Sequence, residues 1–133
     1  MTTEEPQNGT DDQGRRTGLW EEPDEHGGVM RGEYAQGVRV GTWQHLSPQG
    51  RLRSEGGYDD GELHGPWTWW RADGSRLQEG AFDRGARTGR WRRWSADGAL
   101  LDEGEYAGEK KVGPWGSYRP DGSVRAVKEH RPR

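Results

Sequence analysis

Three glutamates stand at equal intervals in the chain and are candidates for acid–base chemistry. Glu55, Glu79 and Glu103 are each separated by 24 residues. Paired carboxylates can act as general acid and general base, but equivalent residues of neighbouring β-hairpins lie two strands apart, about 9–10 Å. We therefore interpret this column as a cross-strand ladder with arginines such as Arg92, Arg93 and Arg71.

The four histidines do not indicate a metal site. His26, His45, His64 and His130 are separated by 19, 19 and 66 residues, which fits no metal-ligand motif. The chain has no cysteine, so thiolate ligands and disulfides are excluded. No P-loop, dinucleotide-binding fingerprint or Gly-x-Ser-x-Gly motif occurs. We expect no catalytic residue, no metal and no cofactor, and therefore a protein that is not an enzyme.

Tryptophan and arginine side chains suggest binding instead of catalysis. Trp67, Trp69 and Trp70 cannot all face one side of a strand, because successive residues point to opposite faces. An exposed aromatic cluster rimmed by arginine marks a contact site. We predict a partner-binding site anchored by Trp69 and composed of Trp69, Trp70, Trp94, Arg71, Arg92 and Arg93.

Two alternatives to this site stay open. The tryptophans can pack on both sides of the sheet as structural residues. The contact with a partner can also lie along the turn edge that carries Arg39, Arg87 and Lys111.

A sequence repeat sets the spacing of the three glutamates and of five tryptophans. Gly-x-Trp occurs five times, beginning at residues 18, 41, 65, 89 and 113, with steps of 23, 24, 24 and 24. A constant period of this length is the signature of a repeat architecture. We predict that two recurring aromatic columns form a structural spine: Trp20, Trp43, Trp67, Trp91 and Trp115, with Tyr34, Tyr58, Phe82 and Tyr106.

The repeat predicts an all-β fold. Glycine makes up 23 of the 133 residues and is spread through every unit, which disfavours helices. Turn sequences such as Asp73-Gly74 and Asp60-Gly61 end short aromatic-rich runs. Each unit of about 24 residues should be one β-hairpin, and successive hairpins should form an elongated twisted antiparallel sheet. The column containing Gly56 leaves room for a ring to lie over bare backbone.

The ends of the chain depart from the repeat. We expect a disordered arm at 1–11, a repeat domain at 12–127 and a charged tail at 128–133. Val124, Ala126 and Val127 are typical of a closing strand whose charged neighbours protect the sheet edge from further pairing.

Composition narrows the classes of partner. The net charge is −3 with no basic excess, which argues against nucleic-acid binding. No apolar run reaches the length of a membrane span, and no secretory signal pattern begins the sequence. We expect a soluble cytoplasmic protein.

The consensus resembles the variant MORN repeat, and more closely the bacterial YwqK-type MORN proteins, which are often labelled antitoxin components. The residues that carry this resemblance are Gly41-x-Trp43, Gly50, Glu55-Gly56-x-Tyr58 and Gly61, with matching sets in the other units over about residues 13–124. The chain departs from the pattern with Trp70 and Trp94 where tyrosine is usual, and with Gly108 before Glu109 in the fourth closing turn.

The resemblance implies a twisted sheet of hairpins that serves as an interaction scaffold. We expect a non-enzymatic protein-binding module, with the antitoxin or immunity partner of a toxin as its specific form. Two alternatives remain: a choline- or glycan-type repeat that stacks aromatic rings around its ligand, and a scaffold associated with a membrane surface.

Overall fold

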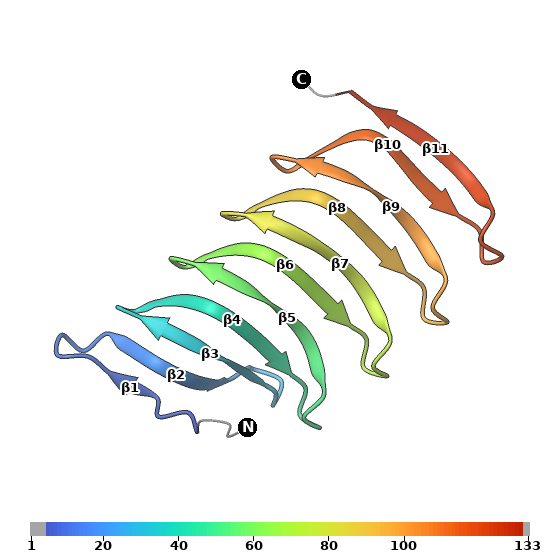
Figure 1. Cartoon of the computed structure of the whole chain (residues 1–133). Coiled ribbons are helices and arrows are strands. Elements are labelled where there is room, and N and C mark those ends of the chain that lie inside the picture. Colours follow the sequence, from blue (N-terminus) through green and yellow to red (C-terminus); the bar gives the residue numbers. More distant parts are fainter. Residues whose placement is uncertain (1–4, 132–133) are drawn as a thin grey trace.

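The computed structural model describes residues 5–131 and confirms an all-β fold. Eleven antiparallel strands form one sheet in which each strand pairs with its neighbours in sequence (Figure 1). No helix is present among the described residues. The strands are β1 (Gly9–Thr10), β2 (Arg16–Pro23), β3 (Val29–Ala35), β4 (Val38–Leu46), β5 (Leu52–Asp59), β6 (Glu62–Trp70), β7 (Arg76–Asp83), β8 (Ala86–Trp94), β9 (Leu100–Ala107), β10 (Lys110–Tyr118) and β11 (Val124–His130).

Two-residue turns join successive units, all at the same end of the strands. In the turn between β5 and β6, Asp60 and Gly61 have φ angles of 50° and 86°. Both values are positive, as a type I′ turn requires. In the fourth closing turn Gly108 and Glu109 have φ angles of 59° and 75°. In this turn the glycine comes first instead of second, and both residues still have the positive φ angles of the other turns.

These turns also tie each hairpin to the preceding one. The amide of Gly61 donates to the carbonyl of Arg39 at 2.9 Å, and that of Gly85 donates to Leu63 at 2.7 Å. The same bond joins Gly37 to Arg16 and Glu109 to Arg87. Each bond passes over the strand between, so neighbouring units are coupled at their turns as well as through the ladder.

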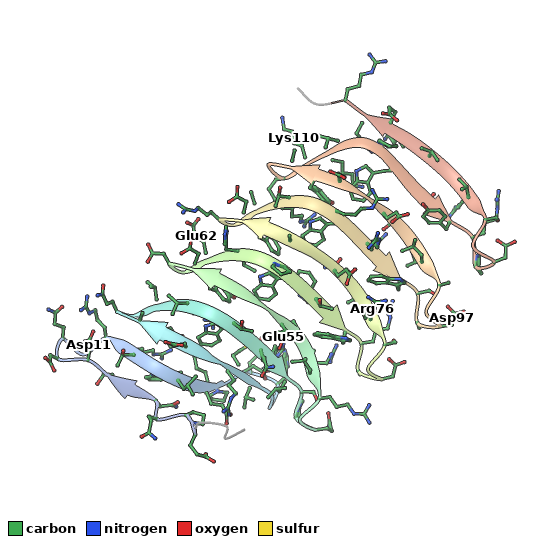
Figure 2. The ribbon with its side chains drawn as sticks, in the orientation of Figure 1. Asp11, Glu55, Glu62, Arg76, Asp97 and Lys110 are labelled. Atoms are coloured by element: carbon green, nitrogen blue, oxygen red, sulfur yellow. The ribbon has the colours of Figure 1, made fainter. Side chains whose placement is uncertain are left out.

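The core is a row of indoles that lie on glycines. The Trp67 ring covers Gly56 of the preceding strand so closely that a Cβ added there would lie 1.9 Å from Cδ2 of the ring. Trp91, Trp115 and Trp43 cover Gly80, Gly104 and Gly32 in the same way. These four tryptophans are between 1% and 9% exposed. No second sheet or helix covers the described sheet (Figure 2), so burial comes from contact between adjacent hairpins.

A hydrogen bond fixes each indole in place. The Nε1 of Trp67 donates to the carbonyl of Gly57 at 3.0 Å, one residue after the glycine that the ring covers. Trp115 donates to Glu105 at 3.0 Å and Trp43 donates to Glu33 at 3.1 Å. A buried indole N–H without an acceptor would be costly, so this bond sets the ring orientation.

The two aromatic columns form one continuous row. Tyr58 contacts Trp43 at 6.1 Å and Trp67 at 5.5 Å between ring centroids, both edge to face. This geometry repeats from Trp20 through all nine predicted spine residues to Trp115. His130 then contacts Trp115 at 6.4 Å and takes the place of the aromatic residue in the last unit.

Both ends of the repeat differ from the expected boundaries. Within the arm expected at 1–11, Gly9–Thr10 pair with β2, and the Gly9 carbonyl accepts the Nε1 bond of Trp20 at 2.9 Å. Residues 1–4 lie outside the described part of the chain. At the other end β11 runs to His130, beyond the expected boundary at 127, because it pairs with β10 along its length. Residues 132 and 133 of the expected tail also lie outside the described part.

The part of the chain that the structure describes holds no helix that could span a membrane.

We predict that Gly80→Ala destabilises the protein by about 3 kcal/mol, at the upper end of the usual cost of overpacking. The new Cβ would lie 2.0 Å from Cδ2 of Trp91, so the indole must move away from its position over residue 80. Gly9→Ala is the control, since its nearest contact is the Thr17 carbonyl at 3.9 Å. Urea titration measures both variants, and equal midpoints for the two would contradict the prediction.

Candidate binding surface

Cations cover the tryptophans on the face that carries the spine, called here the spine face. The guanidinium of Arg39 lies 4.2 Å from the ring centroid of Trp43, and that of Arg16 lies 4.4 Å from Trp20. Arg87 over Trp91 and Lys111 over Trp115 lie at 5.5 and 4.6 Å. Each cation precedes its tryptophan by four residues, a spacing that places both on one face of a strand. Such contacts contribute roughly 0.5–1 kcal/mol each at exposed sites.

The central unit replaces this cation with an aromatic contact. Leu63 stands where the other units have arginine or lysine. In this unit Trp69 stacks on Trp67 at 5.6 Å with an interplanar angle of 26°, and it also contacts Trp91 at 5.7 Å. Trp69 therefore lies on the spine face and bridges two spine tryptophans.

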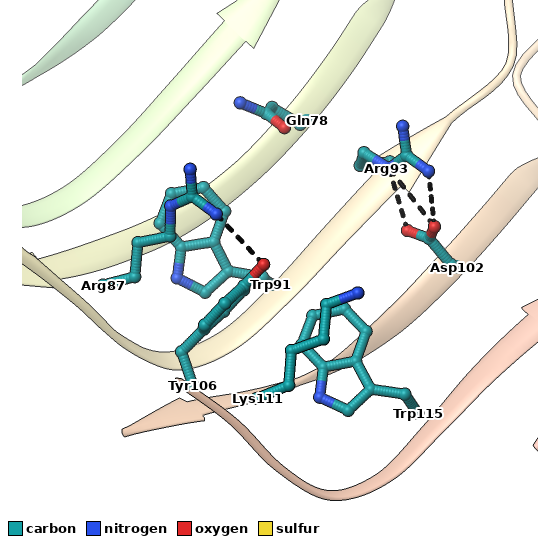
Figure 3. Close-up of a pocket in the computed structure, with 8 residues that line it drawn as sticks. All are labelled: Gln78, Arg87, Trp91, Arg93, Asp102, Tyr106, Lys111 and Trp115. Carbon is teal, nitrogen blue, oxygen red and sulfur yellow. Dashed lines mark hydrogen bonds and ion pairs between the residues drawn. The ribbon is translucent and has the colours of Figure 1, made fainter. Parts of the chain in front are cut away.

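A hollow of about 260 Å³ opens on the spine face over β7–β10 (Figure 3). Aromatic rings of Trp91, Tyr106 and Trp115 line it together with three cations. The complete lining is Gln78, Arg87, Trp91, Arg93, Asp102, Tyr106, Lys111 and Trp115. The repeat places similar rings in every unit, and here consecutive units bring three cations around one hollow.

The three cations differ in how far they are neutralised. Arg93 holds Asp102 with its Nη2 2.6 Å from Oδ2 and its Nε 3.1 Å from Oδ1. Arg87 donates to the Tyr106 hydroxyl at 3.0 Å and lies 3.5 Å from Glu109. Lys111 contacts the Trp115 ring and forms no ion pair with a carboxylate in residues 5–131. The hollow is therefore lined by aromatic rings that lie under cationic side chains, and its lining has a net positive charge, which suits a carboxylate.

The six residues of the predicted partner-binding site do not form one cluster. Trp69 and Arg93 lie on the spine face, since Trp69 contacts Trp67 and Arg93 lines the hollow. Arg92, Trp70 and Trp94 alternate with spine-face residues and lie on the reverse face. Arg71 leaves the strand at the turn, where its Nη2 donates to the Trp94 carbonyl at 2.8 Å and its buried Nε has no acceptor among the described residues.

On the reverse face, Trp70 and Trp94 have arginine neighbours. The Arg76 guanidinium lies 4.2 Å from the Trp94 ring centroid. Arg53 donates to the Trp70 carbonyl at 3.1 Å. The first contact holds the Trp94 ring against the sheet, and the second fixes the Trp70 backbone.

The glutamate column forms a ladder for two of its three members. Arg92 lies 3.0 Å from Glu103 and 3.7 Å from Glu79. Glu103 also accepts from the Tyr118 hydroxyl at 2.8 Å. The hydrogen bond from Arg92, followed by the one from Tyr118, lowers the pKa of Glu103 below its ordinary value. Glu55 instead accepts a hydrogen bond from Gln44 at 2.7 Å. Arg93 pairs with Asp102, and Arg71 donates to the Trp94 carbonyl, so neither arginine joins the glutamate column.

His45 has a structural partner in the turn between β2 and β3. The Nε2 of His45 lies 2.7 Å from Oδ2 of Asp24. This contact, together with the backbone amides of His26 and Gly28, lowers the pKa of Asp24 to about 2. Among the described residues no group of three or more histidine, cysteine, aspartate or glutamate side chains could hold a metal.

Comparisons with known proteins do not place the chain in a family. No protein-family profile matches it, and no curated protein matches its sequence. Two structures of TarM, one of them an S. aureus variant in complex with fondaparinux, α-GlcNAc-glycerol and UDP, share 11% identity at a TM-score of 0.38. A GtfA/B complex bound to UDP and GlcNAc shares 15% identity at a TM-score of 0.30. These alignments cover 71% and 84% of this chain, but the chain spans only 21% and 24% of those proteins. Likeness at this level carries no argument about function.

We predict that Trp69→Ala lowers the free energy of unfolding by about 2 kcal/mol. This lies between the roughly 0.5–1.5 kcal/mol of an aromatic pair and the roughly 3–5 kcal/mol of a fully buried tryptophan. Trp69 is only partly buried but contacts two spine rings. Urea titration checks the value. A variant with the wild-type midpoint would contradict the packing role and leave partner binding as the reason for this residue.

Proposed function

We propose that the chain is a non-enzymatic protein-binding module of the MORN type that takes an acidic segment of its partner on the spine face. The observation that supports this most directly is the hollow over β7–β10, which combines an aromatic floor with Arg87, Arg93 and Lys111. Tryptophan, tyrosine and arginine are the residue types enriched at binding hot spots. An antitoxin or immunity role is the specific form of this function that the MORN resemblance suggests.

The cation contacts favour a protein partner over a choline-type ligand. An aromatic cage binds a quaternary ammonium group through free ring faces. Here the protein's own Arg16, Arg39, Arg87 and Lys111 already lie over four of the five spine tryptophans, and Trp69 contacts the fifth. A cationic ligand would have to displace these side chains, whereas a carboxylate would pair with them.

Lys111 is the residue that best distinguishes an acidic partner from a neutral one. Its ammonium group has no carboxylate partner among residues 5–131 and lies over the Trp115 ring in the lining of the hollow. A carboxylate entering the hollow would gain a charge-assisted hydrogen bond without breaking an existing ion pair. Reversing this charge should therefore weaken binding strongly.

The test captures the partner from a lysate of the source organism and then measures binding with the purified partner. We expect Lys111→Glu to weaken the affinity at least tenfold. Lys110→Glu is the matched control, because the neighbouring lysine is exposed and points to the opposite face. The proposal fails if no protein is enriched over an unrelated bait, or if the captured protein binds both variants as tightly as the wild type.

A further inference from the structure

One position on the spine face changes its residue type from unit to unit. It lies two residues after each spine tryptophan, on the same face of the strand. Facing pairs of the ladder join these positions in one row across the sheet. The residues that hold it are Glu22, His45, Trp69, Arg93 and Ser117. Each stands beside what we call a notch, which is bounded by the cation position of one unit, the second aromatic residue of that unit, and the cation position of the next unit.

In the first unit a glutamate fills the notch. The walls are Arg16, Tyr34 and Arg39. Nη1 of Arg16 donates to Oε2 of Glu22 at 2.8 Å, and the Tyr34 hydroxyl donates to Oε1. Nη2 of Arg39 lies 3.8 Å from Oε1. One carboxylate, only 22% exposed, therefore receives the cations of two successive units and the hydroxyl between them.

In the third unit the notch and its occupant are apolar. Leu63 and Phe82 stand where the first unit has a cation and a tyrosine. The side chain of Trp69 contacts the Phe82 ring at 6.2 Å between centroids, at an interplanar angle of 72°. The occupant thus follows the walls: a carboxylate lies among cations and a hydroxyl, and an indole lies among apolar side chains.

The walls of the fourth notch copy those of the first. They are Arg87, Tyr106 and Lys111. Nη1 of Arg87 donates to the Tyr106 hydroxyl at 3.0 Å, and its guanidinium lies 5.2 Å from the centroid of that ring. The corresponding distances between Arg16 and Tyr34 are 3.1 and 5.4 Å. The fourth unit therefore presents the donors that hold a carboxylate in the first.

No carboxylate of residues 5–131 takes the place of Glu22 in the fourth notch. Arg93 holds the corresponding position and pairs with Asp102 at one side of the hollow, away from the Arg87–Tyr106 pair at the other (Figure 3). Glu109 accepts from the Arg87 amide at 3.1 Å in the turn and does not line the hollow. The Tyr106 hydroxyl donates to no acceptor among the described residues. The three walls of this notch all line the hollow.

We infer that the fourth notch takes the carboxylate of a glutamate or aspartate side chain of the partner, in the arrangement that Glu22 has in the first notch. This inference rests on the proposed function and names the contacts of its acidic ligand. Arg87 and the Tyr106 hydroxyl donate to the carboxylate, and Lys111 pairs with it. Hydrogen bonds from charged donors to a carboxylate are among the strong ones. Within the chain, Glu22 already shows that these wall types accept one carboxylate.

A short peptide tests the ligand class. The purified chain is titrated with the blocked tripeptide Gly-Glu-Gly, and the indole N–H signals of Trp91 and Trp115 are followed by nuclear magnetic resonance. These signals should shift saturably, and the matched peptide Gly-Gln-Gly should bind at least tenfold more weakly. Equal binding of the two peptides, or no saturable shift, would overturn the inference. Tighter binding of inorganic phosphate than of Gly-Glu-Gly would assign the notch to a phosphate group instead of a carboxylate.

Removing Glu22 should create a second site of the same kind. In Glu22→Ala the walls Arg16, Tyr34 and Arg39 lose their own carboxylate. The peptide should then shift the indole N–H signals of Trp20 and Trp43 as well, and the stoichiometry should rise from one peptide per chain to two. A folded Glu22→Ala protein that still binds one peptide would show that the two notches are not equivalent.

Supplying an internal carboxylate should block the fourth notch. Met30 faces Glu22 as Asp102 faces Arg93, so Arg93→Glu/Asp102→Met gives the fourth unit both residues of the first. This variant should bind Gly-Glu-Gly at least tenfold more weakly than Arg93→Ala/Asp102→Met, which loses the same ion pair but gains no carboxylate. Equal affinity of the two variants would contradict the inference.

Tyr106→Phe separates this inference from the proposed function. Phe82 holds the same position in the third unit, so the ring fits without its hydroxyl. The variant should lower the affinity for Gly-Glu-Gly and for a captured partner alike. A partner that responds to Lys111→Glu but neither to Tyr106→Phe nor to Arg93→Glu/Asp102→Met would leave the acidic-partner function standing and overturn the notch. Peptide binding without any captured partner would support the notch and leave the proposed function without its partner.

Discussion

Each interior indole lies flat on the backbone of a glycine in the preceding strand, and its Nε1 donates to the next carbonyl of that strand. This contact joins one unit to the next, because the tryptophan and the glycine belong to successive repeats. No layer covers the described sheet, and this contact buries its largest side chains. Stability in such an array resides in nearest-neighbour interfaces, and here each interface is built around one tryptophan and one glycine.

Other features of the spine face follow from this contact. Because each ring lies against the sheet, its outer face is free for a cation from the same strand, as with Arg39 over Trp43. The hollow over β7–β10 forms where two such units bring Arg87 and Lys111 beside Arg93. The same constraint explains Lys128, which can replace glycine because no tryptophan follows it in the described sheet. The cations over the rings and the lysine in the glycine column therefore both follow from the packing of indole on glycine.

The repeat made most of the fold predictable from sequence. Constant spacing of Gly-x-Trp indicated consecutive hairpins, and the glycine column indicated that rings lie over bare backbone; both are seen. The ends were harder to predict. His130 was not recognised as the last aromatic of the row, since Lys128 and the valines around it break the pattern. At the N-terminal edge the Asn8 side chain forms two hydrogen bonds with the backbone of Glu21, and no periodicity in the sequence predicts them.

The candidate site was less predictable than the fold, for a physical reason. Trp69, Trp70, Trp94 and the three arginines are close in sequence and repeat position, but a strand alternates its side chains between two faces. Which face holds a given residue depends on bulges, and these interrupt the register beside Trp69 and Trp94. The hollow draws instead on Arg87 and Lys111, which lie on the turn edge that the sequence offered as an alternative.

A double-mutant cycle between Gly80 and Trp91 tests the indole-on-glycine contact most directly. If glycine is required only because the Trp91 ring covers it, Gly80→Ala should lose its destabilising effect in a Trp91→Ala background, where no ring meets the new Cβ. The coupling free energy should then be about as large as the cost of Gly80→Ala alone, beyond the roughly 0.3–0.5 kcal/mol seen for independent sites. An unchanged cost of Gly80→Ala in both backgrounds would show that the glycine serves the backbone and not the ring, and would contradict this account.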